Sequence, residues 1–141
     1  SYTVLSKNPN ISLITNRNLS NTIINQGPNF LPIQIINIGD VALNNLNLNS
    51  VSQQDSDMRY TNYGISGSVC SNGQSLNIGE SCMIVVSYTP TTIKSGDINI
   101  APTAQYYDQL GNQLSYAKSS LKINYSSINL NTLFILGGDY G

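Results

Sequence analysis

The sequence predicts an all-β antiparallel sandwich, and three features of its 141 residues support this prediction. Apolar and polar residues alternate along short segments, as in 46–49 and 82–88, which is the pattern of strands buried on one face. β-branched and aromatic residues are frequent, as is asparagine, whose side chain favours turns over helices. No segment keeps a 3.6-residue period. A chain of this length fits one domain, or one domain with an ordered extension at either end. Strands separated by turn signals every ten residues or so are typical of a sandwich.

Residues 1–29 are rich in asparagine and are expected to add one or two edge strands, joined by irregular links, to this sandwich. Short apolar pieces lie at 2–5, 11–15 and 22–24. Pro9 and Pro28 separate these pieces, because proline cannot donate a hydrogen bond to a central strand. The core of the domain is expected to span residues 30–126.

The first half of this core contains two predicted strands and a predicted loop. Residues 30–38 form a strongly apolar segment of strand length, and Gly39-Asp40 follows as a turn. Leu46 and Leu48 alternate with asparagines, which predicts a half-buried strand. Residues 53–63 are polar and are expected to form a loop.

The clearest strand in the sequence is 82–89, which Pro90 ends. A short strand at 65–69 and a turn at Asn72-Gly73 are expected before it. Alternation along 82–89 divides the side chains between two faces of the strand. One face carries Cys82, Ile84, Val86 and Tyr88.

A hairpin is predicted from strands at 97–107 and 114–125, joined by the Gly- and Asn-containing loop 108–113. Leu114 and Tyr116 are out of phase with the later apolar residues Leu121, Ile123 and Tyr125, which predicts a bulge or a change of partner between them. Residues 127–141 are expected to form a C-terminal strand or the start of a following domain.

Charge is sparse, with 6 basic residues, 7 acidic residues and a net charge of −1. Proteins that bind nucleic acid normally present a basic stripe to the phosphates, so no nucleic-acid partner is expected. No apolar run reaches the roughly 20 residues of a transmembrane helix, and none is expected.

Cys70 and Cys82 are the two cysteines of a chain that contains no histidine. This composition argues against a zinc site, and the spacing is far from the C-x-x-C of a redox pair. A structural disulfide is the favoured interpretation, and it indicates an oxidising compartment. We therefore expect an exported protein: periplasmic, on the cell surface or secreted. No secretory signal precedes Ser1, so the chain is expected to be a mature protein or a piece of one.

Two segments resemble the immunoglobulin-like repeat modules of bacterial exported proteins, including those of the choice-of-anchor and ASPM/SPD-2/Hydin-like type. Residues 30–50, FLPIQIINIGDVALNNLNLNS, are similar to the opening "strand, N-x-G, turn, strand" of these modules. Residues 70–92, CSNGQSLNIGESCMIVVSYTPTT, are similar to their "Cys, L-x-x-G-x-S-C-x-I-x-V-x-aromatic-T-P-T" core. The resemblance implies an immunoglobulin-like sandwich and a bridge between Cys70 and Cys82. It implies no activity, because a fold alone does not give one.

The C-terminal segment 132–141, TLFILGGDYG, is similar to the opening strand of a kelch repeat, an apolar strand that ends in a double glycine. If this likeness holds, it implies an accessory domain that precedes a propeller or an enzyme.

No catalytic residue, cofactor or metal is expected. The absence of histidine excludes the usual Ser-His and Cys-His pairs, and nearly all the acidic residues lie at predicted turns, where aspartate caps backbone amides. Asp55 and Asp57 could offer oxygen atoms to Ca²⁺, but this ion needs about 6–8 ligands, so further donors would have to come from another loop. A solvated loop is the favoured interpretation of these two residues.

Tyr60 and Tyr63 are the best candidates for ligand contact, because an aromatic side chain in a polar loop is not required for folding. Exposed aromatic rings stack on sugars or anchor protein contacts. Tyr88, Tyr106 and Tyr125 are instead expected in the core or in cross-strand pairs.

The leading functional hypothesis is a non-catalytic structural or interaction module, used for adhesion or as a spacer. Its partners would be other domains of a longer parent chain and a glycan or protein on a cell surface. Two alternatives stay open: a carbohydrate-binding module that uses Tyr60 and Tyr63, and the accessory domain implied by the C-terminal segment.

Overall fold

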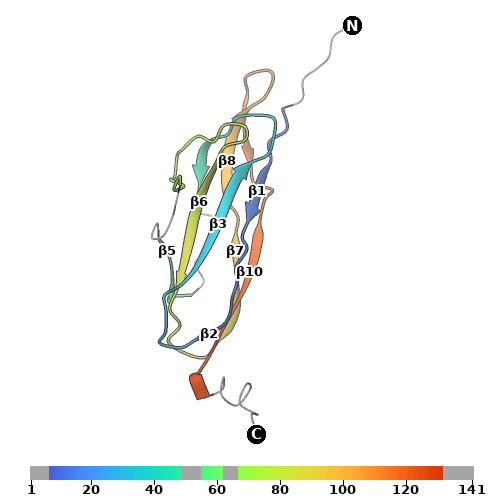
Figure 1. Ribbon diagram of the computed structural model, residues 1–141. Coiled ribbons are helices and arrows are strands. Elements are labelled where there is room, and N and C mark those ends of the chain that lie inside the picture. The colour runs from blue at the N-terminus through green and yellow to red at the C-terminus, as the bar shows by residue number, and fades with distance from the viewer. Residues whose placement is uncertain (1–6, 49–54, 62–66, 132–141) are drawn as a thin grey trace.

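The computed structural model describes residues 7–48, 55–61 and 67–131, which form two packed layers of β-strands (Figure 1). The strands are β1 (Ile11–Ile14), β2 (Leu19–Ile23), β3 (Asn29–Asn37), β4 (Asn44–Asn47), β5 (Met58–Thr61), β6 (Ser81–Tyr88), β7 (Ser95–Ile100), β8 (Thr103–Tyr107), β9 (Gln113–Tyr116) and β10 (Leu121–Ile128). The all-β prediction is confirmed.

The first layer is one antiparallel sheet in the order β1-β3-β6-β5. The second layer consists of two three-stranded sheets, β2-β10-β7 and β4-β8-β9. These two sheets follow one another along the molecule, because β7 leads into β8 and β9 leads into β10 after a few residues (Figure 1). Such a strand order is that of an immunoglobulin-like sandwich, as predicted.

The core lies between the two layers and is built from alternate residues of the long strands. Leu31, Ile33 and Ile35 of β3 are fully buried and lie opposite the alternate residues of β6. The predicted inward face of β6 is confirmed, since its four alternate residues all belong to the core. Burial of these side chains is the main source of stability, at roughly 25 cal/mol for each Å² of apolar surface removed from water.

The predicted hairpin is confirmed in its loop, because β8 pairs with β9 around residues 108–112. The long strand expected at 97–107 is divided at Ala101-Pro102, where proline lacks the N–H that a continuous ladder requires. The predicted change of partner after Tyr116 is also confirmed: β9 pairs with β8, whereas β10 pairs with β7 and β2.

The N-terminal strands lie at sheet edges, as predicted, but in different layers. β1 pairs antiparallel with β3 in the first layer, and the chain then crosses so that β2 pairs with β10 in the second. The β2–β10 pair is parallel, in contrast to the other strand pairs that the structure describes. The second strand and the last strand of the described chain thus lie side by side.

Pro32 lies inside β3, where its missing N–H costs no hydrogen bond. Residues at odd positions of β3 bond to β6 and those at even positions face β1, as the amides of Asn37 and Ile38 show. Pro32 faces the side on which β1 has already ended at Ile14. The Thr15 hydroxyl donates to the Pro32 carbonyl at 2.8 Å, which satisfies the exposed acceptor.

The loop expected at 53–63 is a wrong prediction in part, because Met58–Thr61 forms β5 against β6. The Met58 side chain is buried, and it anchors a strand that is otherwise polar. The short strand expected at 65–69 is reduced, within the described residues 67–69, to an isolated bridge between Val69 and Met83.

The structure explains why Asn37 and Gly39 stand at their positions in the segment Asn37-Ile38-Gly39. Asn37 is fully buried, and its Nδ2 donates to the carbonyls of Val41 and Leu76 at 3.0 and 2.9 Å. Its Oδ1 accepts from the Gly39 amide at 3.0 Å. A Cβ at Gly39 would lie 2.5 Å from the backbone oxygen of Asn8, so only glycine fits here. The motif joins three chain segments at one end of the sandwich.

Several predictions fall on residues outside the described ranges. These are the apolar piece at 2–5, the side chain of Tyr63 and the kelch-like segment 132–141. β10 ends at Ile128, and residues 130 and 131 have helical conformation. Throughout the part of the chain that the structure describes, no helix is long and apolar enough to cross a membrane.

Candidate functional site

The predicted disulfide between Cys70 and Cys82 is present, with a Cα–Cα distance of 5.0 Å. Cys82 lies on the inner face of β6 and Cys70 in the segment that leads back towards β4. Residues after Cys70 follow the outer edge of β4, where Leu76 and Leu43 exchange backbone hydrogen bonds of 2.8 and 3.0 Å. The disulfide therefore links the segment after Cys70, which lies along the edge strand β4, to β6 of the first sheet.

An ion-pair cluster joins the start of β5 to the start of β7. Lys94 Nζ lies 2.8 Å from Asp55 Oδ1 and also bonds Asp57 Oδ2. The Asp55 side chain is only 5% exposed, against 25% for Lys94. The solvated loop predicted for the two aspartates is therefore wrong, and the calcium hypothesis is replaced as well, because the oxygens are directed at an ammonium group.

Further contacts fix the geometry of this cluster. The amide and the hydroxyl of Thr91 donate to Asp57 Oδ2 at 3.1 and 3.0 Å, and the amide of Asp57 donates to Asp55 Oδ1 at 2.9 Å. The hydrogen bond from Lys94, together with those from Thr91, lowers the pKa of Asp57. Burial acts to lower the pKa of Lys94, but its bonds to the two carboxylates outweigh this and raise it.

Two tyrosines predicted to be structural line the same region. Tyr88 and Tyr125 pack edge to face, with ring centroids 5.5 Å apart, and the Lys94 ammonium lies 5.9 Å from the Tyr88 ring centroid. Gly96, opposite Tyr125 in the β7–β10 pair, leaves room for this ring, because a Cβ there would lie 2.6 Å from the hydroxyl. The prediction of core or cross-strand roles is confirmed for both.

Tyr60 lies on the edge strand β5 rather than in a loop. It pairs with Val86, so its ring lies on the inner side of the sheet, at the open edge of the sandwich. The side chain remains 40% exposed, yet burial raises the pKa of its hydroxyl to about 12. The ring is thus partly accessible for contact at this edge. The structure does not describe Tyr63, so the proposed pairing of these two residues stays a prediction.

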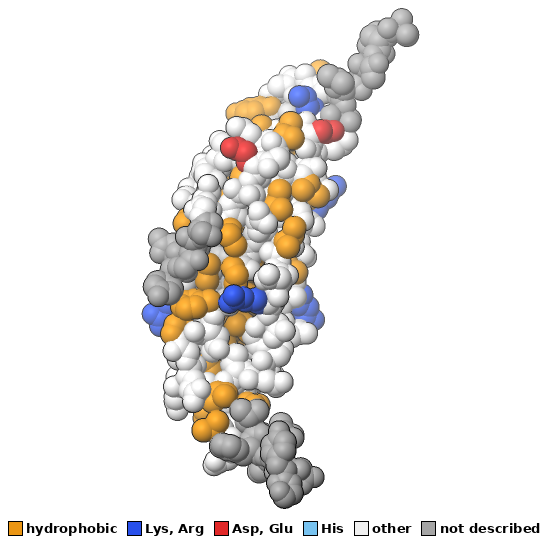
Figure 2. Space-filling view, viewed as in Figure 1, with side chains coloured by type: hydrophobic (Ala, Val, Ile, Leu, Met, Phe, Trp, Pro, Cys, Tyr) orange, Lys and Arg blue, Asp and Glu red, His pale blue; other side chains and the backbone are white. Residues whose placement is uncertain are grey.

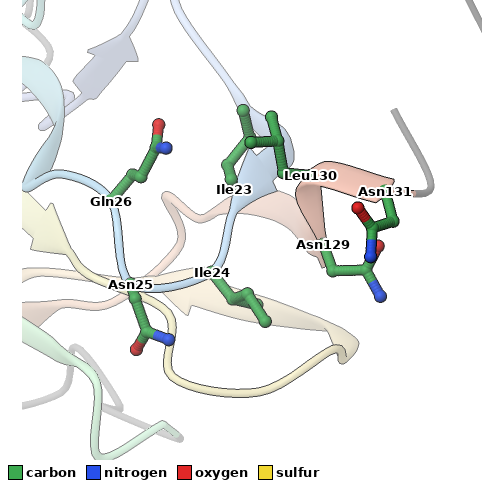
Figure 3. A pocket seen from close by; sticks show the side chains of 7 residues that line it. All are labelled: Ile23, Ile24, Asn25, Gln26, Asn129, Leu130 and Asn131. Atoms are coloured by element: carbon green, nitrogen blue, oxygen red, sulfur yellow. The ribbon is translucent and has the colours of Figure 1, made fainter. Parts of the chain in front are cut away.

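A shallow pocket of about 360 Å³, which sequence reasoning missed, lies where the described chain ends (Figure 3). Its side chains come from the end of β2, from the turn after it and from the chain that follows β10. The lining mixes apolar and amide side chains: Ile23, Ile24, Asn25, Gln26, Asn129, Leu130 and Asn131. No motif marks these residues, because the two segments are about a hundred positions apart in the sequence.

The outer face of the first sheet carries hydrophobic side chains among polar ones. Figure 2 shows hydrophobic side chains along the face formed by β3 and β6, with few charges between them. Ile14, Gln34 and Met83 lie in one row across β1, β3 and β6 on this outer side, and Ile14 is about half exposed. The outer face of β3 is therefore mainly apolar, with Phe30, Pro32 and Ile36 beside the polar Gln34.

No group of three or more His, Cys, Asp or Glu side chains that could hold a metal ion occurs among residues 7–48, 55–61 and 67–131. Asp55 and Asp57 are instead paired with Lys94.

No family model matches the chain, and no curated protein matches it. Among solved structures the chain is similar to AggA, the major subunit of aggregative adherence fimbriae type I from Escherichia coli. That likeness has 10% sequence identity and a TM-score of 0.45, and it covers 90% of this chain and 100% of the AggA chain.

Proposed function

We propose that this domain is a non-catalytic spacer module of an exported protein, built to stay folded under tension. The observation that carries the proposal is the parallel pairing of β2 with β10. The described chain enters the sandwich at one end, near residue 7, and leaves it at the other, near residue 131 (Figure 1). The disulfide supports an oxidising, extracytoplasmic location.

Tension along the long axis would load the terminal strands in shear. The chain runs through β1 and then β2 in the same direction in which β10 leaves the molecule (Figure 1). A pull on the two ends therefore slides β2 against β10 along their common axis, and the bonds between them must break together rather than one at a time. These bonds include Ile24 N–H to the Ile128 carbonyl at 3.0 Å and the Thr22 hydroxyl to the Ser126 carbonyl at 2.8 Å.

Single-molecule pulling tests this proposal. With the module held at its two ends between handles, the Thr22→Val variant is expected to unfold at a clearly lower force than the unchanged protein. The substitution keeps the side-chain shape but removes the bond to Ser126, at a cost of about 1 kcal/mol. Unfolding under force follows the unfolding rate, so loss of a bond that breaks in the limiting step is directly visible.

The matched control is Ile84→Val on β6, a strand outside the β2–β10 pair. This core substitution costs a similar amount, about 1 kcal/mol, in equilibrium stability. The proposal predicts equal denaturant stabilities for the two variants but a lower unfolding force for Thr22→Val alone. Equal forces for both variants, or low-force unfolding of the unchanged module, would contradict it.

The exposed ring of Tyr60 favours a second candidate function, glycan contact together with Tyr63. On a glycan array, the oxidised domain is expected to bind at least one sugar class and to lose this binding in the Tyr60→Ala/Tyr63→Ala double variant. Stacking on one aromatic ring contributes about 1 kcal/mol or more, so loss of two rings lowers affinity at least tenfold. Tyr107→Ala, which removes another exposed tyrosine, is the control and should leave binding unchanged. An array on which the folded domain binds nothing rejects this candidate and leaves the spacer proposal intact.

A further inference from the structure

The Lys94 cluster places two carboxylates on one ammonium group, whereas an ion pair needs only one. One lysine ammonium bonds both Asp55 and Asp57, and the second carboxylate is held on it by two donors from Thr91. The rings of Tyr88 and Tyr125 stand beside this group. Such an arrangement has the three parts that amide formation needs: an amine, a carboxyl carbon and a second carboxylate to carry a proton.

We propose that Lys94 Nζ and Asp55 Cγ condense into an intramolecular amide, a self-formed covalent cross-link between the segment before β5 and the start of β7. The link would join residues 39 positions apart and fasten the edge of the first sheet to the second layer. This inference goes beyond the spacer function and does not depend on it.

The reaction balances without any added reagent. The Lys94 ammonium gives one proton to the Asp57 carboxylate, and the nitrogen lone pair then forms a bond to Asp55 Cγ. One Cγ–O bond breaks, and this oxygen leaves as water with two protons that began on the ammonium, one of them carried by Asp57. The products are a neutral amide, one water molecule and an Asp57 carboxylate that is ionised again. No atom is oxidised or reduced.

The geometry of the ion pair already places the reacting atoms close together. A 2.8 Å distance from Nζ to Oδ1 of Asp55 places the nitrogen within about 3–4 Å of Cγ, close to the separation at which reacting atoms meet. Well-oriented groups in one molecule react with effective concentrations of about 10⁵–10⁸ M. This offsets the preference, in water, for free carboxylate and ammonium over the amide. The 5% exposure of Asp55 limits the water that would reverse the reaction.

The position of Asp57 allows it to carry the proton, although the bonds that hold it there also lower its pKa. Its three donors, Lys94 Nζ and the amide and hydroxyl of Thr91, hold its carboxylate in place beside the ammonium. The bonds that raise the pKa of Lys94 keep the free amine scarce, so the condensation should take hours rather than seconds. The sample is therefore analysed after overnight incubation of the folded, oxidised protein.

Intact-protein mass spectrometry under denaturing and reducing conditions tests the proposal. The unchanged chain is expected to weigh one water molecule less than its sequence mass. Trypsin cleaves after Arg17, Arg59, Lys94 and Lys118, so the cross-link should yield a branched peptide that joins 18–59 to 60–118, uncut at Lys94. Lys94→Arg keeps the cation and both pairings but cannot form this amide, and it should show the full mass.

Two further variants test the roles of the aspartates. Asp55→Ala removes the acceptor carbon and Asp57→Ala removes the proton carrier, and both should show the full mass while circular dichroism confirms that they fold. A full sequence mass for the unchanged, folded protein overturns the proposal. So does a water loss that fragmentation places away from Lys94 and Asp55, or one that persists in Asp55→Ala.

Discussion

Replacement of Asn37 by Asp is expected to destabilise the domain by about 3–5 kcal/mol at neutral pH, although the two side chains have nearly the same shape. The amide donates to two carbonyls, those of Val41 and Leu76, and is fully buried. A carboxylate in its place would direct negative charge at both oxygens and would lose its hydration. Because a domain of this size is stable by only about 5–15 kcal/mol, the loss is a large fraction of the total.

Urea denaturation at two pH values checks this result. Burial and the facing carbonyls would raise the pKa of the introduced carboxyl in the folded state. The introduced carboxyl therefore destabilises the fold least at a pH below its pKa in the unfolded chain. The loss in the free energy of unfolding grows as the pH rises above that value. The deficit should shrink at pH 4 relative to pH 7. Asn99→Asp makes the same charge change at an exposed position and should cost less than about 0.5 kcal/mol. Equal losses of stability in the two variants would show that the buried hydrogen bonds of Asn37 do not stabilise the domain as described.

Removal of the disulfide in a Cys70→Ala/Cys82→Ala variant is expected to cost about 3 kcal/mol. The bridge spans 12 positions, and its loss gives the unfolded chain more freedom. It also releases the segment that covers β4, where the amides of Leu43 and Leu46 bond to Leu76 and Gln74. Denaturant midpoints measure the first effect.

Hydrogen exchange measures the second effect of this variant. The amides of Leu43 and Leu46 should exchange faster by more than the global loss of stability explains, whereas amides of the β7–β10 pair should follow the global change alone. An unchanged midpoint, or uniform acceleration across both regions, would contradict the role of the bridge as a fastener of this segment.

The features that sequence reasoning predicted are those with a local signal. Alternation from Cys82 to Tyr88 places β6 and its inner face, and the phase change after Tyr116 indicates where a strand changes partner. The absence of histidine leaves a disulfide as the simplest role for two cysteines, and the bridge is present. In each case the relevant residues are close together in the chain.

The features that were missed depend on contacts between distant segments. β5 has one buried apolar residue, Met58, and its remaining side chains resemble those of a loop. Lys94 meets Asp55 only because the strand order brings the starts of β5 and β7 together, and no pattern in the sequence records that order. The pocket that follows β10 was missed for the same reason.

The pairing of β2 with β10 has a consequence for how the domain acquires its structure. The Thr22 hydroxyl bonds a carbonyl 104 positions later, so the second layer stays open until nearly the whole chain is available. Contacts of such long sequence separation slow folding, because the chain must give up loop entropy before the contacts form. A growing or translocating chain therefore stays incomplete until Leu121–Ile128 appears.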